Sequence, residues 1–83
     1  MPRDDTSATV VGQILCEARD AAELTQDELA ARSGMDRSYI SDVERGEASL
    51  SVDRLLRLCR ALGVAAATIA HRIESRMERT NQH

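Results

Sequence analysis

The strongest constraint on this chain is a pair of short helical segments separated by only three residues, 34–36. Thr25 and Glu28 form a capping box at the start of the first segment, in which each side chain can bond the other residue's backbone N–H. Gly34 ends that segment, and Asp36 is a favourable N-cap for the next one. Two helices joined so closely must pack against each other across a tight turn.

Capping residues and apolar spacing predict three further helices around this pair. The predicted helices run from a cap at Thr6 or Ser7 to about Ala22, over about 26–33, from Asp36 to Gly46, from Ser51 to Gly63 and over about 65–78. In the fourth helix an apolar arc that includes Val52, Leu56 and Cys59 is wide enough that we expect it to be covered on two sides. The four glycines are interpreted as helix ends.

The composition indicates one small all-α domain. Hydrophobic residues make up 42% of the 83 residues, and there is one Tyr with no Phe or Trp. Because aromatic residues favour strands, their near absence favours helices. We expect a flexible N-terminal arm over residues 1–7, a folded domain over 8–79 and a frayed C-terminus over 80–83. No apolar stretch could span a bilayer and no signal peptide is evident, so we expect a cytoplasmic protein with no membrane partner.

The residues that carry chemistry disfavour several kinds of function. Cys16 and Cys59 are single, widely separated thiols, which argues against a metal site; we expect Cys59 in the core and Cys16 at the surface. His71 and His83 lie near no nucleophile with an orienting carboxylate, so we expect neither an enzyme nor a bound cofactor. The formal net charge of -3 argues against indiscriminate nucleic-acid binding but leaves specific binding open.

The short helix pair and its flanks also carry a family resemblance over about residues 10–70. The segments concerned are Leu24-Thr25-Gln26-Asp27-Glu28-Leu29-Ala30, Ser33-Gly34-Met35, Ser38-Tyr39-Ile40-Ser41, Glu44-Arg45-Gly46 and residues 55–64. They resemble the phage-repressor and xenobiotic-response-element class of helix-turn-helix regulators. The resemblance implies a five-helix DNA-binding domain, with the helix-turn-helix at the second and third helices and the third helix in the major groove.

Helical geometry identifies the side of the third helix that would read DNA. With Ile40 facing inward, the outward residues are Ser38, Ser41, Asp42 and Arg45, flanked by Arg37 and Tyr39. In the alternative interpretation these side chains simply form a solvated helix face, as do Arg54, Arg57 and Arg60 on the fourth helix.

The family resemblance implies a role for each polar residue of this region. Phosphate contacts are implied for Gln26 and Arg45, and base-edge access for Asp36, Arg37, Ser38, Ser41 and Asp42. Arg37 is the best base reader, because a guanidinium can bond guanine O6 and N7 together. Tyr39 is expected to pack on the second helix with its hydroxyl near a phosphate. The carboxylates of Asp36 and Asp42 oppose phosphate binding unless they meet a donor base.

Glu44 falls on the inward edge of the third helix, where a lone carboxylate would be costly. The resemblance implies Arg19 as its partner in a structural ion pair. Both residues are therefore interpreted as structural rather than as DNA-reading.

The last helix is expected to form a homodimer interface. Its apolar and small residues at helical spacing are Ala66, Ile69, Ala70, Ile73 and Met77. The alternative is that these side chains pack wholly within one copy of the chain.

The leading hypothesis is a sequence-specific transcriptional regulator that binds double-stranded DNA as a homodimer on an inverted-repeat operator. One alternative is an antitoxin, which would share this DNA-binding module and also neutralise a partner protein. Another is a protein-interaction module that has lost DNA binding, which the net negative charge would suit. Gln26, Arg37 and Arg45 argue against that second alternative.

Overall fold

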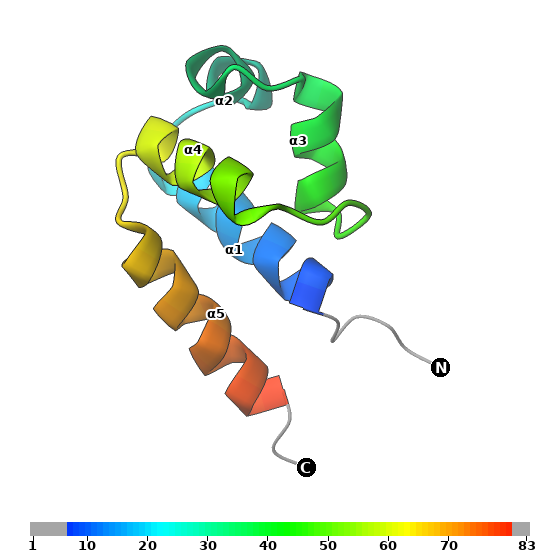
Figure 1. The fold of residues 1–83 in the computed structure, drawn as a ribbon, viewed down its shortest axis with the longest axis vertical. Coiled ribbons are helices and arrows are strands. Elements are labelled where there is room, and N and C mark those ends of the chain that lie inside the picture. The colour runs from blue at the N-terminus through cyan, green and yellow to red at the C-terminus, as the bar shows by residue number, and fades with distance from the viewer. Residues whose placement is uncertain (1–6, 81–83) are drawn as a thin grey trace.

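The computed structural model describes residues 7–80, which form five helices and no strand. The helices are α1 Ser7–Ala21, α2 Gln26–Ser33, α3 Arg37–Glu44, α4 Val52–Leu62 and α5 Ala66–Thr80 (Figure 1). The predicted all-α, five-helix fold is confirmed. Ser7, expected in the arm, instead begins α1, and Thr80, expected to fray, ends α5; the rest of both segments lies outside the described residues. Within this range no helix has both the length and the hydropathy that crossing a membrane requires.

Local capping explains where α2 begins and ends. The Thr25 hydroxyl accepts the Glu28 N–H at 3.0 Å, and the Glu28 carboxylate accepts the Thr25 N–H at 2.8 Å, so the predicted capping box is confirmed. Gly34 ends α2 in the left-handed conformation, with φ at 74°. Asp36 is the N-cap residue of α3, but its side chain makes no capping hydrogen bond. Its carboxylate therefore stays at the exposed start of α3.

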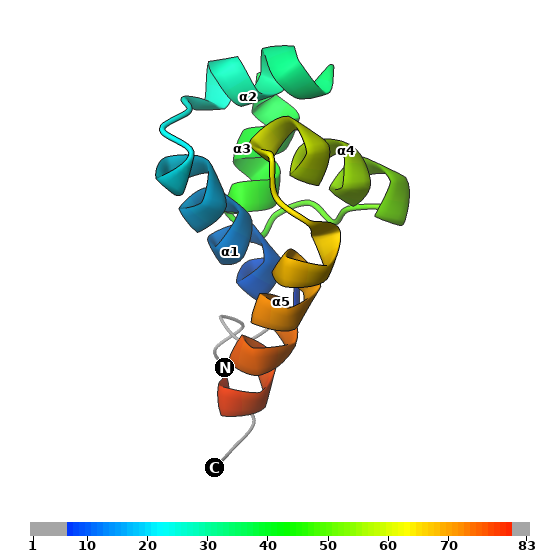
Figure 2. The same cartoon turned by 90° about the vertical axis from the view of Figure 1, so that its left-hand side faces the viewer.

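The helices enclose one core, with α1 packed against both α3 and α5. In Figures 1 and 2 α5 extends beyond the other helices at the end of the long axis. The buried hydrophobic residues are Val10, Ile14, Leu15, Ala18, Leu24, Leu29, Ile40, Val43, Leu58, Cys59, Leu62 and Ile69. The predicted inward positions of Ile40 and Cys59 are confirmed. Because α3 turns Ile40 and Val43 into this core, its opposite side is left to solvent.

Gly12 corrects the interpretation that every glycine is a helix end. It lies inside α1 and is buried where α1 passes the end of α3. A Cβ atom built on Gly12 would lie 2.2 Å from the carbonyl oxygen of Val43 and 2.8 Å from that of Glu44. Only a residue without a side chain allows this approach, which brings α1 against the last turn of α3.

We expect Gly12→Ala to destabilise the protein, although this change in an open helix stabilises by about 0.5–1 kcal/mol. The added methyl group meets backbone atoms that cannot rotate away, which costs about 1–3 kcal/mol. The midpoint of thermal unfolding should fall, by about 4–8 °C for each kcal/mol of net stability lost. Gln13→Ala, at an exposed position of the same helix, is the control and should leave the midpoint nearly unchanged. A Gly12→Ala protein as stable as the parent would contradict the close packing.

Candidate nucleic-acid interface

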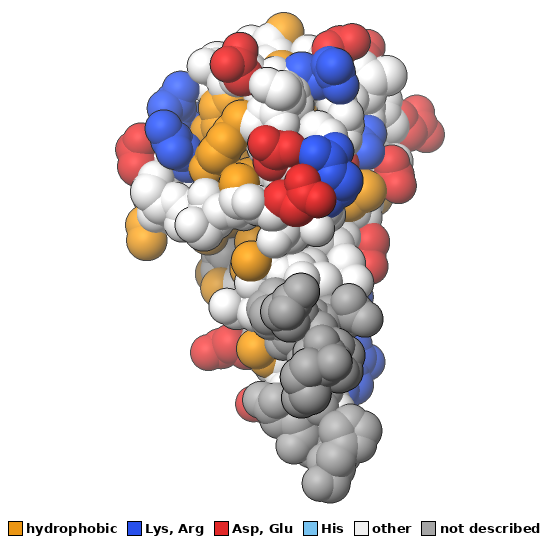
Figure 3. All heavy atoms as spheres, turned by 90° about the vertical axis from the view of Figure 1, so that its right-hand side faces the viewer, with side chains coloured by type: hydrophobic (Ala, Val, Ile, Leu, Met, Phe, Trp, Pro, Cys, Tyr) orange, Lys and Arg blue, Asp and Glu red, His pale blue; other side chains and the backbone are white. Residues whose placement is uncertain are grey.

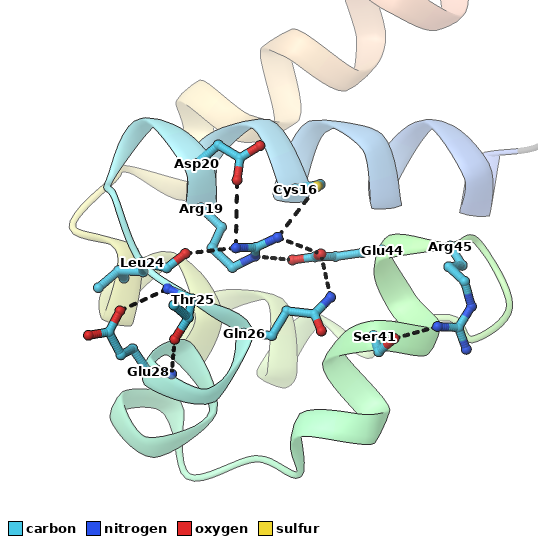
Figure 4. A network of polar contacts seen from close by, with 10 residues as sticks. All are labelled: Cys16, Arg19, Asp20, Leu24, Thr25, Gln26, Glu28, Ser41, Glu44 and Arg45. Atoms are coloured by element: carbon cyan, nitrogen blue, oxygen red, sulfur yellow. Dashed lines mark hydrogen bonds and ion pairs between the residues drawn. The ribbon is translucent and has the colours of Figure 1, made fainter.

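A buried ion pair joins the inner edge of α3 to α1. The Arg19 Nε atom donates to the Glu44 Oε2 atom at 2.7 Å and Arg19 Nη2 donates to Oε1 at 3.1 Å, which confirms the predicted partners. The two side chains are 13% and 7% exposed, so the pair is largely removed from water. Arg19 also donates to the Leu24 carbonyl oxygen at 2.7 Å, so it ties the end of α1 to the start of the helix pair (Figure 4).

Gln26 completes this network from the first residue of α2. Its side-chain Nε2 atom donates to Glu44 Oε1 at 2.9 Å (Figure 4). One carboxylate therefore joins three helices, because Glu44 ends α3, Arg19 lies on α1 and Gln26 begins α2. The sequence predicted only a phosphate contact for Gln26 and missed this bond, since no local spacing connects residues 26 and 44.

The network also sets the protonation of its members. Burial alone would raise the pKa of Glu44, but the hydrogen bonds from Arg19 and Gln26 and the Arg19 charge lower that pKa below its ordinary value. The hydrogen bond to Glu44 raises the pKa of Arg19. Cys16, expected at the surface, is half-buried, and its sulfur lies 3.7 Å from Arg19 Nη2. Burial, followed by the charge of Glu44, raises the pKa of the Cys16 thiol, so the thiol is not activated.

The predicted reading residues lie at the surface of α3 and its N-cap. Four of them are exposed, namely Asp36, Arg37, Ser38 and Arg45. The other three are half-buried, namely Tyr39, Ser41 and Asp42. Figure 3 shows the side of the molecule that carries α3, where acidic and basic side chains are interleaved. The surface that would face DNA is therefore mixed in charge and not a uniform basic patch.

Tyr39 is held differently from the expectation. Its hydroxyl donates to the Ser49 carbonyl oxygen at 2.7 Å, and the guanidinium of Arg54 lies 5.0 Å from its ring centroid. These contacts are with α4 and the segment before it, whereas packing on α2 was predicted. Arg57 donates to the Ser33 carbonyl oxygen at 3.2 Å. Two of the three arginines interpreted as a solvated face thus contact the helix pair or the turn beside it.

The two arginines among the predicted reading residues, Arg37 and Arg45, have different partners. Arg45 donates from Nη1 to the Ser41 hydroxyl, and its Nη2 atom lies 2.6 Å from Asp42 and 3.2 Å from Glu47. Its Nε atom also contacts Glu47, at 3.4 Å. Arg37 forms an ion pair with Asp27, in which Nε lies 3.2 Å from the carboxylate. The roles of Asp27 and Glu47 were missed from the sequence; short spacing from Arg45 could have indicated Glu47, but nothing local indicates Asp27.

The structure changes the predicted dimer surface of α5. Ile69 is 0% exposed and belongs to the core, so it has no surface to offer a second copy. Ala66, Ile73 and Met77 are half-buried against the core, and Ala70 is exposed. Glu17 holds α5 against α1 through Arg72 at 2.8 Å and Arg76 at 2.9 Å. Much of α5 is therefore used within one copy of the chain.

The exposed apolar surface lies instead on α4. Val52 is 73% exposed and Leu56 is 44% exposed, while the other side of this helix is buried in the core. The prediction that the wide apolar arc of α4 is covered on two sides is therefore not met within one copy. An apolar hollow of about 210 Å³ lies between the helices nearby, and its lining includes Val11, Leu50, Leu55 and Ile73.

Comparison with known proteins identifies the helix pair independently. The model of a family described as helix-turn-helix matches residues 17–69. The chain is 41% identical over 56 residues to y4dJ of Sinorhizobium fredii, an uncharacterized HTH-type transcriptional regulator; the match covers 68% of this chain and 73% of y4dJ. The residues that form α2, α3 and α4 all lie inside the family match.

Solved structures with the same fold include two restriction-modification controller proteins. C.AhdI from Aeromonas hydrophila superposes with a TM-score of 0.73 at 40% identity, over 75% of this chain and 94% of that one. A tetramer of C.Esp1396I in complex with its natural 35 base-pair operator superposes with a TM-score of 0.79 at 25% identity. That match covers 86% of this chain and 93% of the controller protein.

We expect Glu44→Ala to lower the free energy of unfolding by about 3 kcal/mol at pH 7 without DNA, because Arg19 then stays buried without its carboxylate. The lowered pKa adds a pH dependence. The stabilisation is complete above the ordinary glutamate pKa of about 4.3 and is lost as the pH falls through the lowered value.

Urea unfolding at pH 7 and across the acid range measures both effects. Glu44→Gln should lack the part of the acid destabilisation that the parent shows below about pH 4.3. Glu47→Ala, in which an exposed carboxylate is removed close by, should change stability by less than about 0.5 kcal/mol. A Glu44→Ala protein that matched the parent at pH 7 would show that the pair does not support the fold.

Proposed function

The chain belongs to the helix-turn-helix family, and we propose that it is a sequence-specific transcriptional regulator with α3 in the major groove of double-stranded DNA. The observation that carries this proposal is the way in which α3 packs against the rest of the domain. Its inner side is held by Ile40, Val43 and the buried Glu44 network, and its polar side is left at the surface. A helix fixed on one side and polar on the other can present side chains to base edges in a defined register.

We propose separate roles for the residues around α3. Arg37 reads a base, and Asp36, Ser38, Ser41 and Asp42 have access to base edges. Gln26 lies at the start of α2, where backbone N–H groups point outward and favour a phosphate. Its amide keeps one N–H beyond the bond to Glu44. The proposal assigns Arg45 to phosphate contact, and Tyr39 to supporting the surface through Ser49.

The proposed role is binding without a catalytic step. The two arginines at the α3 surface, Arg37 and Arg45, pair with carboxylates, an arrangement that suits recognition. His71 lies exposed on α5, and Cys59 is buried in the core, so neither adds a reactive group to that surface.

We propose that a second copy of the chain covers Val52 and Leu56 on α4, together with the exposed edge of α5. A single recognition helix buries little surface, whereas a two-fold dimer places two such helices on one operator. The exposed apolar side chains of α4 supply a surface that water disfavours. The two-fold axis implies an inverted-repeat operator with half-site centres about 10 bp apart, or a multiple of that spacing.

We expect Leu56→Asp to weaken the dimer by at least about tenfold, because it places a charge in an apolar contact. Leu56 is 44% exposed in one copy, so the monomer should keep its fold. Sedimentation at matched concentrations measures the shift, with circular dichroism to check helix content. Gln13→Asp on exposed α1 is the control and should dimerise like the parent. A parent that stays monomeric at high micromolar concentration would exclude the dimer, and full dimerisation of Leu56→Asp would exclude this interface.

Base reading and phosphate contact should separate in binding assays on an operator selected from random DNA. We expect Arg37→Ala to remove discrimination at one G·C position in each half-site, at a cost of about 1–3 kcal/mol. Gln26→Ala should weaken cognate and non-cognate DNA by similar factors. The thermal unfolding of Gln26→Ala must also be measured, because that change removes a bond to Glu44 as well. Equal loss by Arg37→Ala on all sequences would contradict its role as a reader.

A further inference from the structure

The two arginines of the α3 surface differ in which atoms their own chain already uses. Every guanidinium nitrogen of Arg45 has an acceptor, because Nε, Nη1 and Nη2 contact Glu47, Ser41 and Asp42. Arg37 contacts one carboxylate, that of Asp27, and the contact is made by Nε. The Nη1 and Nη2 atoms of Arg37 form the opposite edge of the same planar group.

That remaining edge matches what the proposed reading requires. A guanidinium bonds guanine O6 and N7 through two parallel N–H groups, and the Nη1–Nη2 edge supplies such a pair. The Asp27 carboxylate lies 3.2 Å from Nε, at the opposite end of the group from this edge. Without that ion pair, the long Arg37 side chain would lose more rotamer freedom when it met a base.

Asp27 is attached to a rigid part of the domain. It lies in the first turn of α2, beside Gln26, which bonds to Glu44, and within the capping box of Thr25 and Glu28. Arg37 is the first residue of α3, on the other side of the turn. The contact therefore restrains the side chain that is proposed to read the base relative to α2.

We propose that Asp27 is a specificity-determining residue that positions Arg37 for guanine reading; this inference rests on the proposed function. Asp27 and Arg37 are 81% and 54% exposed, and exposed ion pairs add little to stability. Loss of Asp27 therefore affects sequence discrimination and leaves the fold intact. The opposing explanation is that Asp27 only repels phosphates, in which case its loss would strengthen binding to every sequence alike.

Two substitutions separate these explanations. Asp27→Ala removes the carboxylate altogether, whereas Asp27→Asn removes the charge and keeps a side chain of nearly the same size. Glu47→Ala is the matched control, because it removes an exposed carboxylate that pairs with Arg45. Each protein is titrated at one salt concentration against the parent's selected operator and against operators changed at the base pair that Arg37→Ala identifies.

We expect Asp27→Ala to lower the ratio of cognate to changed-operator affinity by at least about fivefold, with an unchanged thermal midpoint. Asp27→Asn should lower the ratio as well, because it also ends the ion pair, and Glu47→Ala should keep all of it. In an Arg37→Ala background, Asp27→Ala should cause no further loss, because the two changes act on one contact. Equal ratios for the parent and Asp27→Ala would overturn the positioning role, as would an equal gain in affinity for every operator.

Failure of the inference and failure of the proposed function give different results. If the parent shows no sequence preference, the regulator proposal itself fails. If the parent discriminates but Arg37→Ala discriminates equally well, Arg37 is not the reader and the role of Asp27 falls with it. If Arg37→Ala loses discrimination and Asp27→Ala retains it, only the positioning by Asp27 is wrong.

Discussion

The Glu44 carboxylate is the group on which the arrangement of α3 depends. It sits at the end of α3, is 7% exposed, and accepts hydrogen bonds from Arg19 on α1 and Gln26 on α2. A buried charge must have its partners in place, so the three helices cannot shift independently. Gly12 lets the backbone of α1 approach the same end of α3. Ion pair and close contact together define where α3 points.

The carboxylates around α3 pair with arginines at the surface, and this pairing reconciles an acidic chain with DNA binding. Asp27, Asp42 and Glu47 each lie within 3.2 Å of Arg37 or Arg45. Non-specific binding depends on cations that release counterions from phosphates. Arginines already paired with carboxylates contribute less to that term, so a correct base contact becomes a larger share of the total affinity. On this view the net charge of -3 favours selectivity over affinity.

Use of α5 within the monomer explains why the apolar surface left for assembly lies on α4. Ile69 closes the core, and Glu17 with Arg72 and Arg76 holds α5 along α1. The wide apolar arc of α4 is therefore buried on one side only, which leaves Val52 and Leu56 in solvent. The prediction of a second covered side can still be met by another copy of the chain.

The sequence alone determined the features that depend on neighbours within about four positions. The Thr25 capping box, the left-handed Gly34 and the bounds of α2 follow from local hydrogen bonds, and helical periodicity correctly turned Ile40 and Glu44 inward. The choice of Arg19 as the partner of Glu44 came from family resemblance.

Only the tertiary structure decided which side chains from different helices meet. Four features show this: the close approach at Gly12, the bond from Gln26 to Glu44, the pairing of Asp27 with Arg37 and the burial of Ile69. Each depends on residues that are far apart in the sequence. Such contacts depend on how the helices cross and which surfaces their packing uses up. A periodic pattern marks a residue as inward or outward, but it does not say which residue it will face.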